Sequence, residues 1–192
     1  MNVLLYPLRY LTLTDEDRRR LLARNLLTII VITTILSVPF IFSDANFFGE
    51  RGFLDRFGGF CGVLTGFYIA ALVGIASVTG TMSGLDKEIQ IGKIYGIREN
   101  GAQVALTRRE YVSAIFGYLA FVSFGLSVVA ILLVATAGAA KSILPYWVGC
   151  ITLCLFNLVL SHMIVTTCHG LYYFIDRIYY QEPTLGAKVK RD

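Results

Sequence analysis

The sequence predicts an all-α membrane protein: a bundle of four transmembrane helices, with both termini cytoplasmic and a short β-like hairpin between the second and third spans. Three observations predict this fold class. Apolar side chains make up 56% of the 192 residues and charged ones only 16%, below the roughly one quarter usual in soluble domains. The charges gather in clusters separated by four long uncharged runs. Lys and Arg also fall mainly on one side of the predicted spans.

The uncharged runs predict spans at about 22–43, 57–85, 109–140 and 143–176, within a single membrane domain covering 1–192. A helix needs about 20 residues to cross the hydrocarbon core. The first run is just long enough. The other three exceed this length, so those helices should tilt or extend past the membrane.

The distribution of basic residues predicts the orientation. Fourteen of the 17 Lys and Arg residues lie in the N-terminal segment, in the loop between spans two and three counted through Arg109, and in the 177–192 tail, and only three lie in the other two loops. Basic residues near span ends mark the cytoplasmic side. We therefore expect a multi-pass protein of the plasma (inner) membrane. The first span is too long for a cleaved signal peptide and no A-x-A site follows it, so we expect it to be retained.

The N-terminal segment predicts a helix that leads into the first span. Thr14 followed by acidic residues at 15–17 is typical of a helix start, because carboxylates favour the positive end of the helix dipole. That helix would carry three cations to the level of anionic lipid headgroups: Arg18, Arg19 and Arg20. They either bind lipid phosphates or only signal topology. Within the first span, Pro39 should kink the helix or end it early.

The 86–108 loop predicts a hairpin. An Asn-Gly pair lies between two β-prone runs, which is a strong signal for a tight turn. A lone two-stranded hairpin is marginal in water, so it should pack on its own chain, on another subunit or on a cytoplasmic partner. The turn supplies the predicted partner-docking residues: Arg98, Glu99, Asn100 and Gly101. Thr107 and Glu110 then form a capping box that opens the third span.

The second span carries a ridge of small residues, one every four positions: Gly58, Gly62, Gly66, Ala70 and Gly74. Small residues at this spacing let two helix backbones approach closely. The ridge packs either against another helix of the same chain or against a second subunit. Ser113, Gly117 and Gly125 form a weaker version on the third span, which is therefore the natural partner within the chain.

The spans contain little reactive chemistry. No Asp, Glu, Lys or Arg lies in the uncharged runs themselves, which are 25–43, 57–85, 111–140 and 142–175. This argues against proton pumps and coupled transporters. No phosphate-binding loop, nucleophile elbow or metalloprotease motif occurs, so we expect no enzyme activity and no cofactor. His162 and His169 lie two helical turns apart, too far to share one metal ion, so we expect no metal site. Instead we expect His162 to bond to a neighbouring helix and His169 to lie at the interface.

Two stretches each allow two interpretations. The polar segment Ser77–Gly84 either lines a cavity or is the water-exposed end of a helix that is longer than the membrane is thick. The aromatic segment Tyr172–Tyr180 is either an interfacial belt or a surface for docking a partner.

Four spans, this length, an inside N-terminus, no catalytic motif and a structured loop between spans two and three are together similar to the KwaA family. These are the four-span membrane subunits of the bacterial Kiwa anti-phage defence system. The resemblance covers the whole chain, but no individual residue is carried over. It implies a homo-oligomeric membrane sensor or scaffold with a cytoplasmic, DNA-binding partner. The loop Asp86–Glu110 and the two tails would then form the docking surface.

We therefore expect a non-enzymatic, oligomeric membrane sensor or scaffold that recruits a cytoplasmic protein, touches anionic lipid and binds no nucleic acid itself. The alternative is a homo-oligomeric channel or pore-forming effector, suggested by the glycine ridge and the hydroxyl-rich spans.

Overall fold

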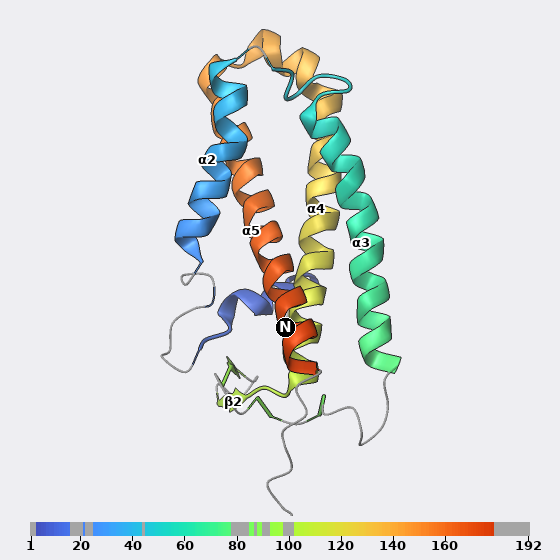
Figure 1. Cartoon of the computed structure of the whole chain (residues 1–192). Helices are drawn as coiled ribbons and strands as arrows, with labels where there is room; N and C mark the ends of the chain where they lie inside the picture. Colours follow the sequence, from blue (N-terminus) through green and yellow to red (C-terminus); the bar gives the residue numbers. More distant parts are fainter. Residues whose placement is uncertain are drawn as a thin grey trace, which may run out of the picture.

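The protein is mostly helical, with four long helices running up and down side by side (Figure 1). The computed structural model describes residues 3–15, 21, 25–43, 45–77, 85–86, 88–89, 93–97 and 102–178. Over these residues the chain forms a 3-10 helix η1 (Val3–Thr12) and helix α2 (Leu26–Phe42). Helix α3 (Phe53–Ser77), strands β1 (Tyr95–Ile97) and β2 (Gln103–Ala105), and helices α4 (Arg108–Ile143) and α5 (Tyr146–Ile178) follow.

Three of the described helices are long and apolar enough to cross a membrane: Phe53–Ser77, Arg108–Ile143 and Tyr146–Phe174. The prediction of a membrane protein is therefore supported at this level. Helix α2 is equally apolar but has 17 residues, or about 25 Å at 1.5 Å per residue, against about 30 Å of hydrocarbon. A fourth crossing and the sidedness of the termini stay predictions.

Helix α2 continues through its proline and ends three residues later, close to the predicted end of the first span, so the expected early end is not seen. Pro39 lacks an N–H for the helical ladder, and the helix stops at Phe42. Earlier in α2, two hydroxyls are satisfied within the helix, because Thr33 and Thr34 donate to the carbonyl oxygens of Ile29 and Ile30 at 2.8 and 2.9 Å. The helix packs mainly on α5.

Helices α3 and α4 make the most extensive pairing in the bundle, as the sequence predicted. The residues of α3 that reach the interior recur with a coiled-coil period: Leu54, Gly58, Cys61, Tyr68 and Ile75. Helix α4 starts at the predicted capping box, in which Thr107 accepts from the N–H of Glu110 and the Glu110 carboxylate accepts from the N–H of Thr107. This fixes where the third long helix begins.

At the end opposite the hairpin, phenylalanine rings join three helices and the loop between α2 and α3. Their ring centroids follow one another at 4.8 to 6.2 Å. We call this set the phenylalanine cluster: Phe40, Phe47, Phe48, Phe53, Phe57, Phe60 and Phe156. Phe47 lies at its centre and is 4% exposed. Offset and edge-on ring contacts of this kind stabilise beyond simple burial.

The hairpin forms at the other end of the bundle. Strands β1 and β2 pair antiparallel, with Tyr95 opposite Ala105 and Ile97 opposite Gln103. The predicted hairpin is thus present, although its turn at 98–101 lies outside the described residues. Three other predicted features also lie outside them: residues 16–20 of the N-terminal helix start, most of Ser77–Gly84, and the tail after Ile178.

Candidate functional site: the hairpin end of the bundle

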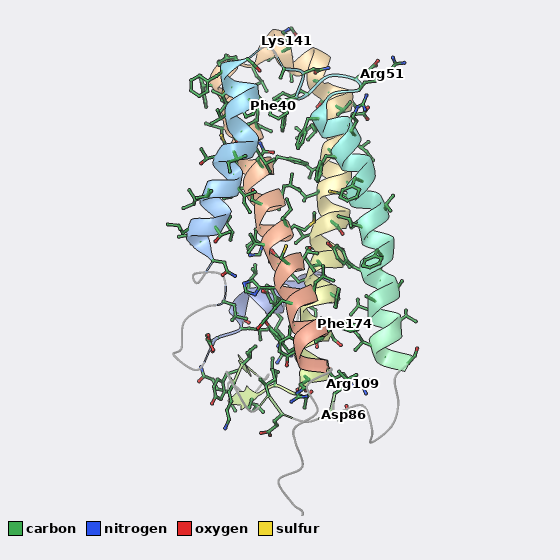
Figure 2. All side chains as sticks on the ribbon, viewed as in Figure 1. Phe40, Arg51, Asp86, Arg109, Lys141 and Phe174 are labelled. Atoms are coloured by element: carbon green, nitrogen blue, oxygen red, sulfur yellow. The ribbon has the colours of Figure 1, made fainter. Side chains whose placement is uncertain are left out.

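The structure gathers its most elaborate polar contacts at the hairpin end. There the described parts of η1, β1 and β2 lie at the same end of the bundle as the first turns of α4 and the last turns of α3 and α5 (Figure 1). Figure 2 shows Asp86, Arg109 and Phe174 at this end, and Phe40, Arg51 and Lys141 at the opposite one. We call the group formed by η1, residues 13–15, the two strands and the Asp86–Arg109 contact the hairpin end.

The N-terminal segment holds the hairpin by main-chain hydrogen bonds. Thr14 donates its N–H to the carbonyl of Tyr95 at 3.1 Å, and Tyr95 donates back to the carbonyl of Thr14 at 2.9 Å. Strand β1 therefore has the N-terminal segment on one edge and β2 on the other. Leu13, only 2% exposed, packs close to Gly96. Of the three packing partners expected for the hairpin, the structure shows its own chain, and Thr14 is a pairing residue here.

The strands are also tied to the start of α4. Leu106 donates to the carbonyl of Ile94 at 2.9 Å, and Ile89 donates to the carbonyl of Leu106 at 3.4 Å. Glu88 and Thr107 form an isolated bridge just before the capping box. Because a helix start is geometrically fixed by its cap, these bonds place the hairpin at a fixed position relative to α4.

Arg109 connects three segments at this end. Its Nε donates to Oδ1 of Asp86 at 2.7 Å, and one of its terminal nitrogens donates to the carbonyl of Ile75, near the end of α3, at 2.6 Å. Its backbone N–H donates to the carbonyl of Leu85 at 2.9 Å. The hydrogen bond from Arg109 lowers the pKa of Asp86, so this carboxyl is ionised at neutral pH.

A line of rings leads from η1 into the bundle. The ring of Tyr10, which is 6% exposed, lies 5.0 Å from that of Tyr118 in α4. The hydroxyl of Tyr118 is 2.9 Å from Nδ1 of His162 in α5. The predicted bond of His162 to a neighbouring helix is therefore confirmed. Tyr118 therefore contacts both the N-terminal segment and α5.

Other polar pairs join the helices farther inside. Thr65 and Ser123 lie 2.9 Å apart between α3 and α4, and Tyr68 and Thr167 lie 2.7 Å apart between α3 and α5. Asn157 of α5, which is fully buried, donates to Ser37 of α2 at 3.1 Å. In an apolar surrounding such bonds fix how helices are rotated against each other.

The glycine ridge divides between two faces. A Cβ on Gly58 would lie 2.6 Å from the Cβ of Ala130, and one on Gly62 would lie 3.4 Å from the hydroxyl of Ser127. These two glycines therefore serve the contact with α4. Gly66 and Gly74 have no neighbour within 4 Å, and Ala70 is exposed with them. Use of this outer part as a subunit seam stays a prediction.

The structure corrects which part of the third span meets the ridge. We expected Ser113, Gly117 and Gly125 to provide the close approach, but a Cβ on Gly117 or Gly125 would have no neighbour within 4 Å. The close approach is made by Ser127 and Ala130 instead. An alanine serves the same purpose as a glycine at a helix crossing, because both leave room for the opposing backbone.

The remaining predicted site residues are distributed as follows. The docking turn Arg98, Glu99, Asn100 and Gly101 and the headgroup cations Arg18, Arg19 and Arg20 lie outside the described residues. Among the described residues, no three His, Cys, Asp or Glu side chains gather closely enough to hold a metal ion. In the aromatic segment, Tyr172 and Phe174 are exposed, while the Tyr173 ring packs edge-on against Tyr111 at 4.9 Å.

Sequence reasoning missed the contacts that assemble this end. The Asp86–Arg109 pair had a usable signal, since two opposite charges bracket the loop between two apolar runs. The Thr14–Tyr95 pairing and the Tyr10–Tyr118 contact had none, because they join segments far apart in the sequence. Comparison with protein-family models, curated proteins and solved structures finds no match for this chain.

Proposed function

We propose that this chain is a non-enzymatic membrane scaffold or sensor whose hairpin end faces the cytoplasm and recruits a soluble partner protein. In this proposal all four long helices cross the plasma (inner) membrane and both termini are cytoplasmic. The physiological role is that of the Kiwa-type membrane subunits which the sequence resembles: a membrane component of an anti-phage defence system, acting with a cytoplasmic partner.

One observation carries the proposal: the hairpin is fixed to the spans rather than hanging from them. Main-chain bonds to Thr14 and Leu106 hold its strands, and Arg109 ties the neighbouring loop to α3. A surface of this kind is pre-organised, so a partner that binds it loses little conformational entropy on the scaffold side. A simple connecting loop would not need these bonds.

Two further features support the proposed orientation and surroundings. The hairpin end belongs to the segments that hold most of the Lys and Arg residues, as cytoplasmic segments do. Arg18, Arg19 and Arg20 precede α2, where cations would meet anionic headgroups on the same side. The outer part of the glycine ridge, at Gly66, Ala70 and Gly74, is the surface we propose for self-association.

The interior polar pairs favour a scaffold over a channel within one chain. The hydroxyl of Tyr118, the hydroxyl of Thr65 and the side-chain amide of Asn157 each bond to a residue of another helix. Polar groups engaged in this way hold helices together and are not lining a water-filled path. Ion flux through liposomes that contain the full chain would support the channel alternative, and tight liposomes would support the scaffold.

The docking proposal is tested by charge reversal at the two ends of the bundle. Arg98→Glu with Glu99→Lys exchanges two charges at the turn. Asp55→Lys with Arg56→Glu makes the same exchange at the opposite end, where both side chains are exposed, and is the matched control. The readout is the amount of cytoplasmic protein from the host lysate that co-purifies with the full wild-type chain and with each variant. We expect the turn variant to recover about tenfold less partner, equivalent to about 1.4 kcal/mol, and the control to recover the wild-type amount. Equal recovery by both variants would contradict docking at the turn.

A further inference from the structure

The end opposite the hairpin carries a second surface, which the proposed function does not use. It consists of the last turns of α4 and the first residues of α5. We call residues 135–147 the tip. Lys141 lies at the far end of the molecule in Figure 2, and the last turns of α4 lean across the end of the bundle in Figure 1. Its side chains are mostly exposed.

The register between α3 and α4 fixes the height of the tip. The two helices run antiparallel, and Gly58 meets Ala130. One turn farther along, Leu54 is level with about Val134, since a turn of helix is 3.6 residues. Three exposed charged residues lie within about one turn of this level: Asp55 and Arg56 just before it, and Arg51 just beyond it. Charged side chains avoid the hydrocarbon core, so this level marks a membrane surface. The tip begins where the hydrocarbon ends.

The length of α4 leads to the same position. Its 36 residues span about 54 Å, against about 30 Å of hydrocarbon. At the hairpin end the helix is fixed by Arg109 and its bond to Ile75 of α3. The excess therefore emerges mainly at the tip, where a helix continuing straight would extend into water.

The tip nevertheless exposes bulky apolar side chains. Ile143 is 78% exposed, Leu144 50%, Tyr146 76% and Trp147 62%. Burying apolar surface stabilises by about 25 cal/mol for each Å² removed from water. Side chains left in water do not gain this free energy. Trp and Tyr are the residues that favour the headgroup level, and a Lys beside them can extend its ammonium to lipid phosphates. Lys141 is the cation available here.

We infer that the tip is a lipid-binding surface that lies along the membrane on the side opposite the hairpin. Ile143, Leu144, Tyr146 and Trp147 enter the headgroup layer, and Lys141 contacts phosphate. The tip thus anchors the bundle at one membrane surface. As a result, the hairpin end is held at a fixed distance from the opposite membrane surface. This inference rests on the membrane crossing in the proposed function, but not on the partner.

The chain provides its own probe, because Trp147 is its single tryptophan. The full chain is placed in phosphatidylcholine vesicles whose acyl chains carry bromine either near the carbonyl end or near the terminal methyl. Bromine quenches tryptophan fluorescence only at close range. We expect quenching of Trp147 to be about twofold stronger with the shallow bromines, as for aromatic residues at the interface. Aqueous iodide should quench it only in part.

A reference position separates failure of this inference from failure of the membrane proposal. Trp147→Phe with Phe124→Trp moves the probe to the middle of α4, where Phe124 is 59% exposed and lies outside the glycine ridge. We expect this probe to be quenched most by the deep bromines. If the reference behaves so while Trp147 is quenched fully by iodide and by neither lipid, the tip projects into water and the inference is wrong. If deep bromines quench Trp147 best, the tip is buried in hydrocarbon and the inference is equally wrong. An unquenched reference would overturn the membrane crossing itself, and the inference with it.

Discussion

The two ends of the bundle are held together by different kinds of contact. At the tip end, the phenylalanine cluster joins α2, α3, α5 and their connecting loop through stacked and edge-on rings. At the hairpin end, the joining groups are main-chain bonds between Thr14 and Tyr95 and the side-chain bonds of Arg109. One end uses dispersion and burial, and the other uses directional hydrogen bonds.

This difference suggests a division of roles. Ring contacts are strong in sum but tolerate small rotations, so they contribute cohesion. Hydrogen bonds are modest in net energy but demand a set geometry, so they position segments that water surrounds. We therefore expect substitutions in the phenylalanine cluster to lower the stability of the whole bundle. Substitutions at the hairpin end should instead loosen that end and leave the bundle intact.

The largest expected effect is that of Phe47→Ala. Phe47 touches four other rings of the cluster and is 4% exposed, so truncation leaves a cavity where α2, α3 and α5 meet. Such a change costs about 3–5 kcal/mol in well-packed cores. The measurement is the free energy of unfolding in detergent, with unfolding monitored as the loss of the helical circular dichroism signal.

Phe48→Ala is the matched control. Phe48 is half-buried and its ring contacts that of Phe47 within the same loop. We expect it to lower the unfolding free energy by less than half as much as Phe47→Ala. Equal losses for the two variants would show that the loop as a whole, rather than the central ring, holds this end.

A smaller effect is expected where the glycine ridge meets α4. Gly58→Ala places a methyl group 2.6 Å from the Cβ of Ala130, which is backbone-fixed and unable to swing away. Overpacking of this kind costs about 1–3 kcal/mol. Gly66→Ala meets no atom within 4 Å and should leave the unfolding free energy unchanged or slightly higher.

A larger substitution in the outer ridge tests self-association. If the outer ridge is a subunit seam, Gly66→Leu should reduce cross-linked dimer in membranes while the monomer stays folded. Unchanged cross-linking would mean that lipid alone covers Gly66, Ala70 and Gly74.

The ridge also shows which helix contacts can be predicted from the sequence and which cannot. A repeat of four residues advances about 40° per step around a helix of 3.6 residues per turn. From Gly58 to Gly74 the ridge therefore turns about 160°, so one straight neighbour cannot cover all of it. The number and kind of long helices, the α3–α4 pairing and the capping box at Thr107 followed from local pattern. Which residues of α4 meet the ridge did not, because helix register depends on how both surfaces fit.

The hairpin end shows the complementary limit. Alternating β-prone residues and an Asn-Gly pair were sufficient to predict two strands. The partner of β1 on its other edge was not predictable, because Thr14 lies 81 positions earlier than Tyr95 and carries no pairing signal. Contacts such as Tyr10 on Tyr118 arise from assembly of the bundle, after the local elements are in place.

The smallest expected effect separates local order from global stability at the hairpin end. Asp86→Asn removes the charge that Arg109 holds, while Arg109 keeps its bond to the carbonyl of Ile75. Because the Asp86 side chain is 65% exposed, the unfolding free energy should hardly change. The amides of Ile89 and Leu106, which bond within this end, should exchange hydrogen faster, as measured by mass spectrometry. Glu88→Gln is the control, since it removes a neighbouring exposed charge and should leave exchange as in the wild type.

Acidification should reproduce the Asp86→Asn result in the wild-type protein. The hydrogen bond from Arg109 lowers the pKa of Asp86 in the folded state below its ordinary value of 3.8. The contact therefore contributes fully above that value and is lost as the pH falls through the lowered pKa. Protection of Ile89 and Leu106, corrected for intrinsic exchange, should stay constant from neutral pH to about pH 5, where a carboxyl of ordinary pKa is still largely ionised. A loss of protection already near pH 6 would mean that another group, and not Asp86, controls the order of the hairpin end.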